Sequence, residues 1–121
     1  MRIHRVELLA GARAARGIAV VIDVFRACSL IAYALAGGAR RIVPVASLTT
    51  ARELKRRHPD WLLLGERNGI PPEDFDGGNS PAHLVQRELA GRTIIHTTSA
   101  GTQGLMAAAA AAQAVLAGAF V

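Results

Sequence analysis

Two charged side chains directly follow an apolar stretch of this sequence. Gly17–Ile22 is almost entirely aliphatic, and Asp23 and Arg26 come immediately after it. Such a run is typical of a strand buried on both faces, and a carboxylate at its end is costly without a partner, a metal or solvent. Because ligands of open α/β sheets bind at the carboxyl ends of strands, Asp23 marks the edge of a candidate site. Arg26 indicates an anionic ligand.

The same arrangement recurs twice further along the chain. The apolar run Trp61–Leu64 is followed by Glu66 and Arg67, and the run Thr93–His96 leads into a polar turn, Thr97–Thr102. Right-handed crossovers bring the carboxyl ends of parallel strands to one rim of a sheet. These charged and hydroxyl groups, although separated in sequence, are therefore expected to face a single crevice.

The residue types at this rim suit the transfer of a phosphoryl group to water. Asp23 and Glu66 can hold Mg²⁺, which takes one or two protein carboxylates together with water and phosphate oxygens. Arg26 and Arg67 can make bidentate contacts with a phosphate or sulfonate. The turn Thr97–Thr102 precedes an expected helix and offers hydroxyls and free N–H groups to an anion. A metal and arginines that neutralise charge are the usual components of phosphoryl transfer.

Several other phosphate chemistries are excluded by spacing. The sequence has no Gly-x-x-x-x-Gly-Lys-Ser/Thr loop, and Gly101 and Gly104 do not form a dinucleotide fingerprint. Cys28 is followed six positions later by Ala34 rather than by the arginine of a cysteine-dependent phosphatase. Each polar residue also has a purely structural interpretation. Asp23 can pair with a neighbouring arginine, and His96 can be structural rather than catalytic.

The elements that must position these groups alternate along the chain. We expect strands at Ile3–Leu9, Ile18–Val24, Arg41–Val45, Trp61–Leu64, Thr93–His96 and Ala114–Ala117, and helices at Ala27–Ala36, Leu48–His58, Pro81–Leu89 and Gln103–Ala112. The alternation predicts a single α/β domain over residues 1–121. Its mainly parallel sheet should carry helices on both faces, in a three-layer, Rossmann-like arrangement.

Composition restricts the class of ligand and the cellular compartment. The net charge is +5, but the basic residues are scattered apart from Arg40-Arg41 and 55–57, and no aromatic residues alternate with them. This pattern argues against nucleic-acid binding and for a solvated basic surface that suits a small anionic substrate. The C-terminal apolar stretch is too short to span a membrane, and the N-terminus lacks a signal-peptide pattern. With Cys28 as the single cysteine, we expect a cytoplasmic protein.

Four short motifs are spread over nearly the whole chain: Asp-Val-Phe-Arg-Ala at 23–27, Gly-Glu-Arg at 65–67, Phe-Asp-Gly-Gly-Asn-Ser-Pro at 75–81 and Thr-Thr-Ser-Ala-Gly-Thr at 97–102. In their order and spacing, these motifs resemble the 2-phosphosulfolactate phosphatase family. The resemblance implies Mg²⁺-dependent hydrolysis of 2-phospho-3-sulfolactate to 3-sulfolactate and phosphate, a step in coenzyme M biosynthesis. It implies catalytic roles for Asp23, Arg26 and Glu66, with metal ligation by Asp23 and Glu66, and substrate binding by Arg67, Asn79, Ser80, Thr97, Thr98, Gly101 and Thr102. The general base stays open.

The chain departs from the family pattern at a few positions. Cys28-Ser29 stands where the family has Ser/Thr-Thr, and Ala100 stands where it has asparagine. Family members are about twice as long, so this chain resembles the N-terminal half of a larger two-part fold. An exposed sheet edge would then favour a homo-oligomer. A non-catalytic phosphate- or anion-binding domain is the alternative function, and nucleic-acid binding is a third.

Overall fold

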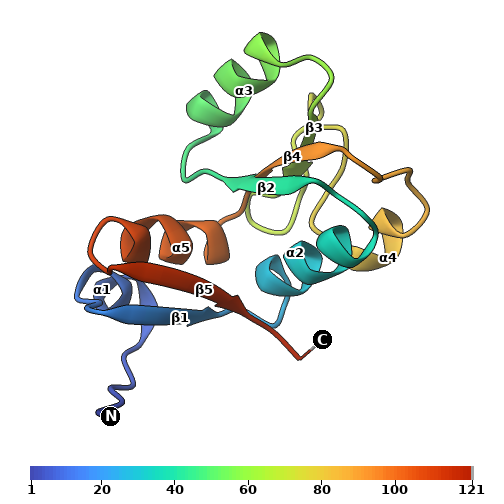
Figure 1. The fold of residues 1–121 in the computed structure, drawn as a ribbon. Coiled ribbons are helices and arrows are strands. Elements are labelled where there is room, and N and C mark those ends of the chain that lie inside the picture. Colours follow the sequence, from blue (N-terminus) through green and yellow to red (C-terminus); the bar gives the residue numbers. More distant parts are fainter. Residues whose placement is uncertain (121) are drawn as a thin grey trace.

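The computed structural model describes residues 1–120, in which strands and helices alternate (Figure 1). In chain order the elements are α1 (Leu8–Arg13), β1 (Ile18–Ile22), α2 (Ala27–Ala36), β2 (Arg41–Pro44), α3 (Leu48–Arg57), β3 (Leu62–Gly65), α4 (Pro81–Leu84), β4 (Thr93–Thr97), α5 (Gly101–Ala109) and β5 (Ala114–Gly118). All the paired strands run parallel. The expected α/β class is confirmed.

The strands form two sheets rather than the one continuous sheet expected. β1 pairs with β5, and β4 lies between β2 and β3. Figure 1 shows α2 and α5 lying between the two sheets, and each helix contacts strands of both. Both helices consist mainly of small and apolar residues, and a helix without a strongly polar face can be buried on several sides. These helices separate the sheets, which is why the single-sheet expectation was wrong.

The sheet β2-β4-β3 is the three-layer part of the fold. Neighbouring residues on β4 point to opposite faces, as strand geometry requires. Ile94 packs in one core with Leu30 of α2 and Leu84 of α4, whereas Ile95 packs in a second core with Ala51 of α3. Helices therefore cover both faces of this sheet, as expected.

In the part of the chain that the structure describes, the sheet β1-β5 is covered on one face only. Val21 points toward Gly104 of α5, but Ile18, Val20 and Ile22 on the opposite face are 72%, 57% and 70% exposed. The expectation that this strand is buried on both faces was wrong. An apolar run reports the hydrophobicity of both faces, but burial of the second face needs a further packing element, and residues 1–120 place none there.

Apart from shifts of a few residues at the ends of β1, α3, α5 and the other strands, one expected strand is missing and one expected helix is shorter. The expected strand Ile3–Leu9 is absent: residues 1–7 have no regular secondary structure, and α1 begins at Leu8. The helix α4 ends at Leu84 rather than near Leu89. Both leucines belong to one core, yet five residues of helix would place them about 140° apart, so the chain must leave the helix.

Two further observations concern the helices. The predicted N-cap of α3 is confirmed, since Ser47 Oγ accepts a hydrogen bond from the Thr50 N–H at 3.0 Å. Within residues 1–120, none of the helices combines the length and apolar character needed to cross a bilayer.

Candidate functional site

The carboxyl ends of β1, β3 and β4 meet around the turn that precedes α5. Asp23 follows β1, Glu66 follows β3, and Thr97 is the last residue of β4. Ser99, in the turn, hydrogen-bonds to Glu66, and Gly101, at the start of α5, lies against Asp23. The predicted rim therefore joins the ends of strands from both sheets, and the turn is the element that connects them.

The Asp23 carboxylate lies at the N-termini of two helices. The Ala27 N–H, in the first turn of α2, donates to Asp23 Oδ1 at 3.4 Å. A Cβ at Gly101, the first residue of α5, would collide with both the Asp23 carboxylate and Ala27. The first N–H groups of a helix lack partners within the helix and attract negative charge. Glycine at 101 therefore allows α2 and α5 to approach from two sides and surround the carboxylate with positive potential.

Glu66 is buried and accepts three hydrogen bonds. Its Oε1 accepts from the Ser99 N–H at 2.7 Å, and its Oε2 accepts from the Gly69 N–H at 2.7 Å and the Ser99 hydroxyl at 2.9 Å. Burial alone would raise the pKa of Glu66, but these donors outweigh it and hold the pKa below its ordinary value. The ionised carboxylate therefore fastens the 66–69 loop to the turn before α5.

Arg67 ties the ends of neighbouring strands together. Its Nη2 donates to the Thr97 hydroxyl at 2.7 Å and to the Ala46 carbonyl at 3.0 Å, and its Nη1 donates to the carbonyl of Glu66 at 2.7 Å. The guanidinium thus lies at the predicted rim, where it bridges the ends of β2 and β4. Thr97 turns its hydroxyl to this bridge.

Thr98 and Thr102 satisfy each other at the start of α5. The Thr102 N–H donates to Thr98 Oγ1 at 3.0 Å, and the Thr98 N–H donates to Thr102 Oγ1 at 2.7 Å. Both side chains are fully buried. Such reciprocal bonds close a helix N-terminus, so these hydroxyls shape the turn, while its exposed part is formed by Ser99 and Ala100.

Asn79 is held in the interior by His96. The His96 Nε2 lies 3.0 Å from Asn79 Oδ1, which makes Nε2 the protonated nitrogen of a neutral ring. Burial lowers the pKa of His96 to about 4. Ser80 directly precedes α4 but makes no capping hydrogen bond, and it lines a separate pocket of about 50 Å³ with Arg87. His96 therefore links Asn79 to β4, whereas no hydrogen bond in residues 1–120 joins Ser80 to Asp23.

Arg26 is the exposed cation nearest in sequence to the Asp23 carboxylate. It immediately precedes α2, and within the described chain its guanidinium forms neither a hydrogen bond nor an ion pair. Asp23, whose carboxylate receives a single long hydrogen bond, is likewise available to a ligand. Asp23 and Arg26 can therefore bind a charged ligand, whereas the polar atoms of Glu66 and Arg67 are already hydrogen-bonded to several protein groups.

The donor set at the rim fits a hard divalent cation through one carboxylate. Residues 1–120 bring together no group of three or more His, Cys, Asp or Glu side chains that could enclose a metal. Mg²⁺ does not require such a group, because it is commonly held by one or two carboxylates plus water and substrate phosphate. Asp23 meets that requirement, whereas three donors already occupy the oxygens of Glu66.

The residues that the sequence interpretation missed are mainly backbone donors. The Gly69 and Ser99 N–H groups fix Glu66, yet backbone donors have no residue signature in a sequence. The Ser99 hydroxyl was the one detectable signal, as a small polar side chain inside the predicted turn. The pairing of His96 with Asn79 was also missed. A histidine inside an apolar strand indicates a buried partner but does not say which one.

Comparison with known proteins gives a consistent set of matches. A family model described as 2-phosphosulpholactate phosphatase matches residues 3–121. A relative from Caldicellulosiruptor saccharolyticus, named probable 2-phosphosulfolactate phosphatase, is 42% identical over 103 residues, which are 85% of this chain and 42% of the relative. A relative of the same name from Thermotoga petrophila is 47% identical over 85 residues, 70% of this chain and 37% of the relative. A third, from Thermoplasma acidophilum, is 41% identical over 85 residues, 70% of this chain and 39% of the relative.

The match covers only part of the length of each relative. The chain spans about two fifths of the length of these curated relatives, since the matched shares are 42%, 37% and 39%. The match itself extends over almost all of this chain and includes the rim around Asp23. This chain belongs to the 2-phosphosulfolactate phosphatase family.

Proposed function

We propose that this chain forms the metal- and phosphate-binding part of a Mg²⁺-dependent phosphatase that converts 2-phospho-3-sulfolactate to 3-sulfolactate and phosphate. The observation that carries the proposal is the position of Asp23 between the N-termini of α2 and α5, three residues before Arg26, whose guanidinium has no partner within residues 1–120. A carboxylate that keeps free oxygens, together with helix N–H groups and a free guanidinium, suits a cation and a phosphate side by side.

The residues divide between binding and positioning. Asp23 would hold Mg²⁺, which when bound would neutralise charge on the phosphoryl oxygens. Arg26 binds the phosphate or the sulfonate, since both are oxyanions that fit a guanidinium fork. Glu66 and Arg67 hold the turn before α5 and the ends of β2 and β4 in place. The role of Glu66 as a ligand stays a prediction, as do the substrate contacts of Arg67, Asn79, Ser80, Thr97, Thr98, Gly101 and Thr102.

The proposal is tested by phosphate release from 2-phospho-3-sulfolactate and from a panel of small phosphate monoesters, with Mg²⁺ and with EDTA. We expect Mg²⁺-dependent turnover that Asp23→Asn lowers roughly 100-fold or more, the scale of losing one group that stabilises developing charge. Asp60→Asn is the matched control, because Asp60 is exposed and lies at the amino ends of the strands. Equal activity in the two variants would contradict the assignment of Asp23.

A second candidate function follows from the extent of the match. Because the chain spans only about two fifths of its relatives, catalysis can require residues that it does not contain. The chain is then a phosphate-binding unit without turnover of its own. Binding of the same ester in the presence of Mg²⁺, without phosphate release, would favour this function, whereas turnover by the chain alone would exclude it.

The surroundings of the protein form part of the same proposal. We place it in the cytoplasm, in the pathway to coenzyme M, on the support of its single cysteine and its family.

We also propose a homo-oligomer in which a second copy covers the open face of β1-β5. The exposed side chains there, Ile18, Val20, Ile22 and Leu116, are all apolar, so two such faces meet without opposing charges.

A further inference from the structure

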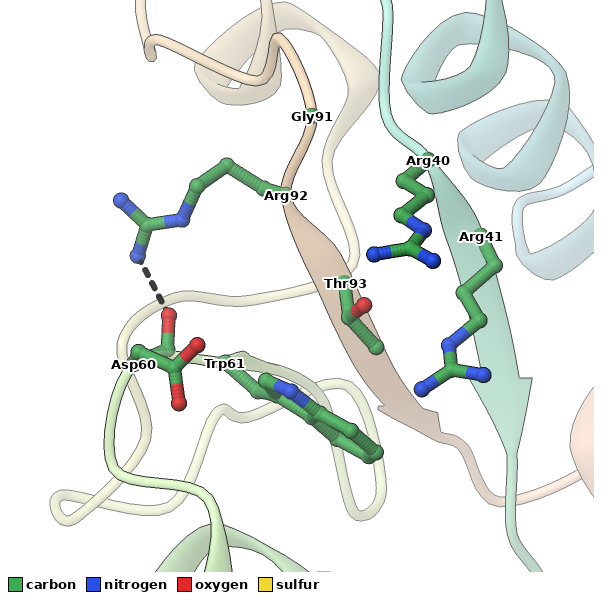
Figure 2. Close-up of a pocket in the computed structure, with 7 residues that line it drawn as sticks. All are labelled: Arg40, Arg41, Asp60, Trp61, Gly91, Arg92 and Thr93. Atoms are coloured by element: carbon green, nitrogen blue, oxygen red, sulfur yellow. Dashed lines mark hydrogen bonds between the residues drawn. The ribbon is translucent and has the colours of Figure 1, made fainter.

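A second group of charged side chains lies at the end of the strands opposite to Asp23. It lines a pocket of about 360 Å³ at the amino ends of β2 and β4 (Figure 2). The residues that the argument uses are Arg40, Arg41, Arg92, Asp60, Trp61 and Thr93. Because the strands are parallel, the length of the sheet separates this pocket from the carboxyl-end rim.

Strand pairing places the arginines side by side. The Arg40 N–H donates to the Arg92 carbonyl at 2.8 Å, and the next residue, Arg41, pairs in register with Thr93. Figure 2 shows the guanidinium groups of Arg40, which immediately precedes β2, and Arg41, the first residue of β2, extending toward Thr93 and Trp61. Arg92 Nη2 donates to the backbone carbonyl of Asp60 at 2.8 Å, which holds its side chain along the pocket wall.

The pocket has more positive than negative charge. It holds three guanidinium groups and the single carboxylate of Asp60, and within the described chain none of the three arginines forms an ion pair. Three arginines elsewhere, on α3, are paired with Asp74 or Glu53. Neighbouring like charges repel each other, and an anion between them would remove that cost. The excess of three guanidinium groups over one carboxylate therefore indicates an anionic ligand.

Trp61 restricts the kind of anion. His58 stacks on its ring with centroids 3.9 Å apart, and the Arg41 guanidinium lies over the ring at 5.0 Å. Two groups this close to the ring centre cannot share one face, so both faces are occupied and no nucleobase can stack there. Recognition then depends on charge, and each guanidinium can bind phosphate oxygens in a bidentate manner.

We propose that this pocket binds a compact polyanion of linked phosphate groups, of the class of inorganic pyrophosphate, independently of the phosphatase site. The probe is pyrophosphate in EDTA at constant ionic strength, and the readout is the fluorescence of Trp61, the single tryptophan of the chain. Isothermal calorimetry repeats the titration, because a substitution close to Trp61 can alter the fluorescence of Trp61 without altering binding. We expect saturable binding by both methods.

Variants locate the binding. Arg40→Gln and Arg92→Gln should each weaken pyrophosphate binding about tenfold or more, which is the scale of losing a charged hydrogen bond. Arg40→Lys, which keeps the positive charge, should bind pyrophosphate more tightly than Arg40→Gln does. Arg56→Gln, on the exposed surface of α3, is the matched control and should bind as the parent does. Asp23→Asn should also leave binding unchanged, which separates this result from the fate of the proposed phosphatase activity.

Three outcomes would overturn the proposal. The first is that sodium chloride at the same ionic strength produces the same signal as pyrophosphate. The second is that Arg40→Gln and Arg56→Gln bind pyrophosphate with equal affinity. The third is that an arbitrary DNA duplex binds more tightly than pyrophosphate does. The last would assign the arginines to a nucleic-acid backbone, and it would show a steep dependence on salt.

Discussion

Ser99 donates both of its polar hydrogens to the two oxygens of the Glu66 carboxylate. The N–H reaches Oε1 at 2.7 Å and the hydroxyl reaches Oε2 at 2.9 Å, while Ser99 Oγ accepts from the Asn68 N–H at 2.8 Å. Because Gly101 is two residues further along, this pair also determines where the N-terminus of α5 meets Asp23. A buried carboxylate thus sets the geometry of the rim even if it never touches a ligand.

Replacing Glu66 by glutamine should destabilise the fold. The amide NH₂ of glutamine would face one of the N–H or O–H groups that donate to the carboxylate, and one hydrogen bond would be lost. We therefore expect the free energy of unfolding, measured by urea denaturation at pH 7, to fall by about 1–3 kcal/mol. Glu73→Gln is the control, since Glu73 is exposed. The folded pKa of Glu66 is lowered, so its contribution is present above an unfolded pKa near 4.5 and is lost as pH falls through the folded value. The glutamine variant should lack that acid-sensitive contribution.

His96 should make the protein less stable as the medium becomes mildly acidic. Its pKa is about 4 in the folded chain and 6.5 for an unperturbed histidine, so between these values the unfolded chain binds the additional proton. Stability should fall as pH decreases from 6.5 toward 4, by at most about 3 kcal/mol. His96→Gln should flatten this dependence in urea denaturation at several pH values, whereas the exposed His83→Gln should not. An unchanged slope in His96→Gln would show that other groups cause it.

Adding one methyl group at Gly101 should disturb the site. A Cβ there would collide with Ala27 and the Asp23 carboxylate, so Gly101→Ala should cost about 1–3 kcal/mol and reduce Mg²⁺-dependent phosphate release. Gly104→Ala, one turn later in α5, is the matched control. Its Cβ would lie 3.5 Å from Val21, an ordinary contact, and alanine favours a helix over glycine by up to about 1 kcal/mol. Thermal unfolding should therefore separate the two variants in opposite directions.

The open face of β1-β5 should control self-association. Val20 is 57% exposed in the middle of that face, so Val20→Lys should leave the unfolding free energy within about 0.5 kcal/mol and shift the protein toward monomer. Sedimentation velocity at several concentrations measures the change. Ile70→Lys is the control, because Ile70 is 72% exposed in a loop away from the sheet. If both variants associate as the parent does, this face is not the interface.

Much of the local structure follows from sequence patterns. Short-range rules placed the start of α3 at the Ser47 cap, the end of α2 before Gly37, and Asp23 at the end of β1. The four motifs also indicated the family, which the comparisons confirmed. These features depend on neighbouring residues, whose types and spacing are explicit in the sequence.

Tertiary structure alone decided what lies on each side of those elements. The apolar pattern of β1 could not show that no helix of residues 1–120 covers one of its faces, because hydrophobicity does not specify a partner. The separation of two sheets by α2 and α5 depends on packing between distant segments. The same holds for Glu66, whose donors Gly69 and Ser99 are backbone and turn groups brought together by the fold. The sequence by itself placed Asp23, Glu66 and Thr97 at the ends of strands, and the long-range contacts determined which of these groups stay free to bind a ligand.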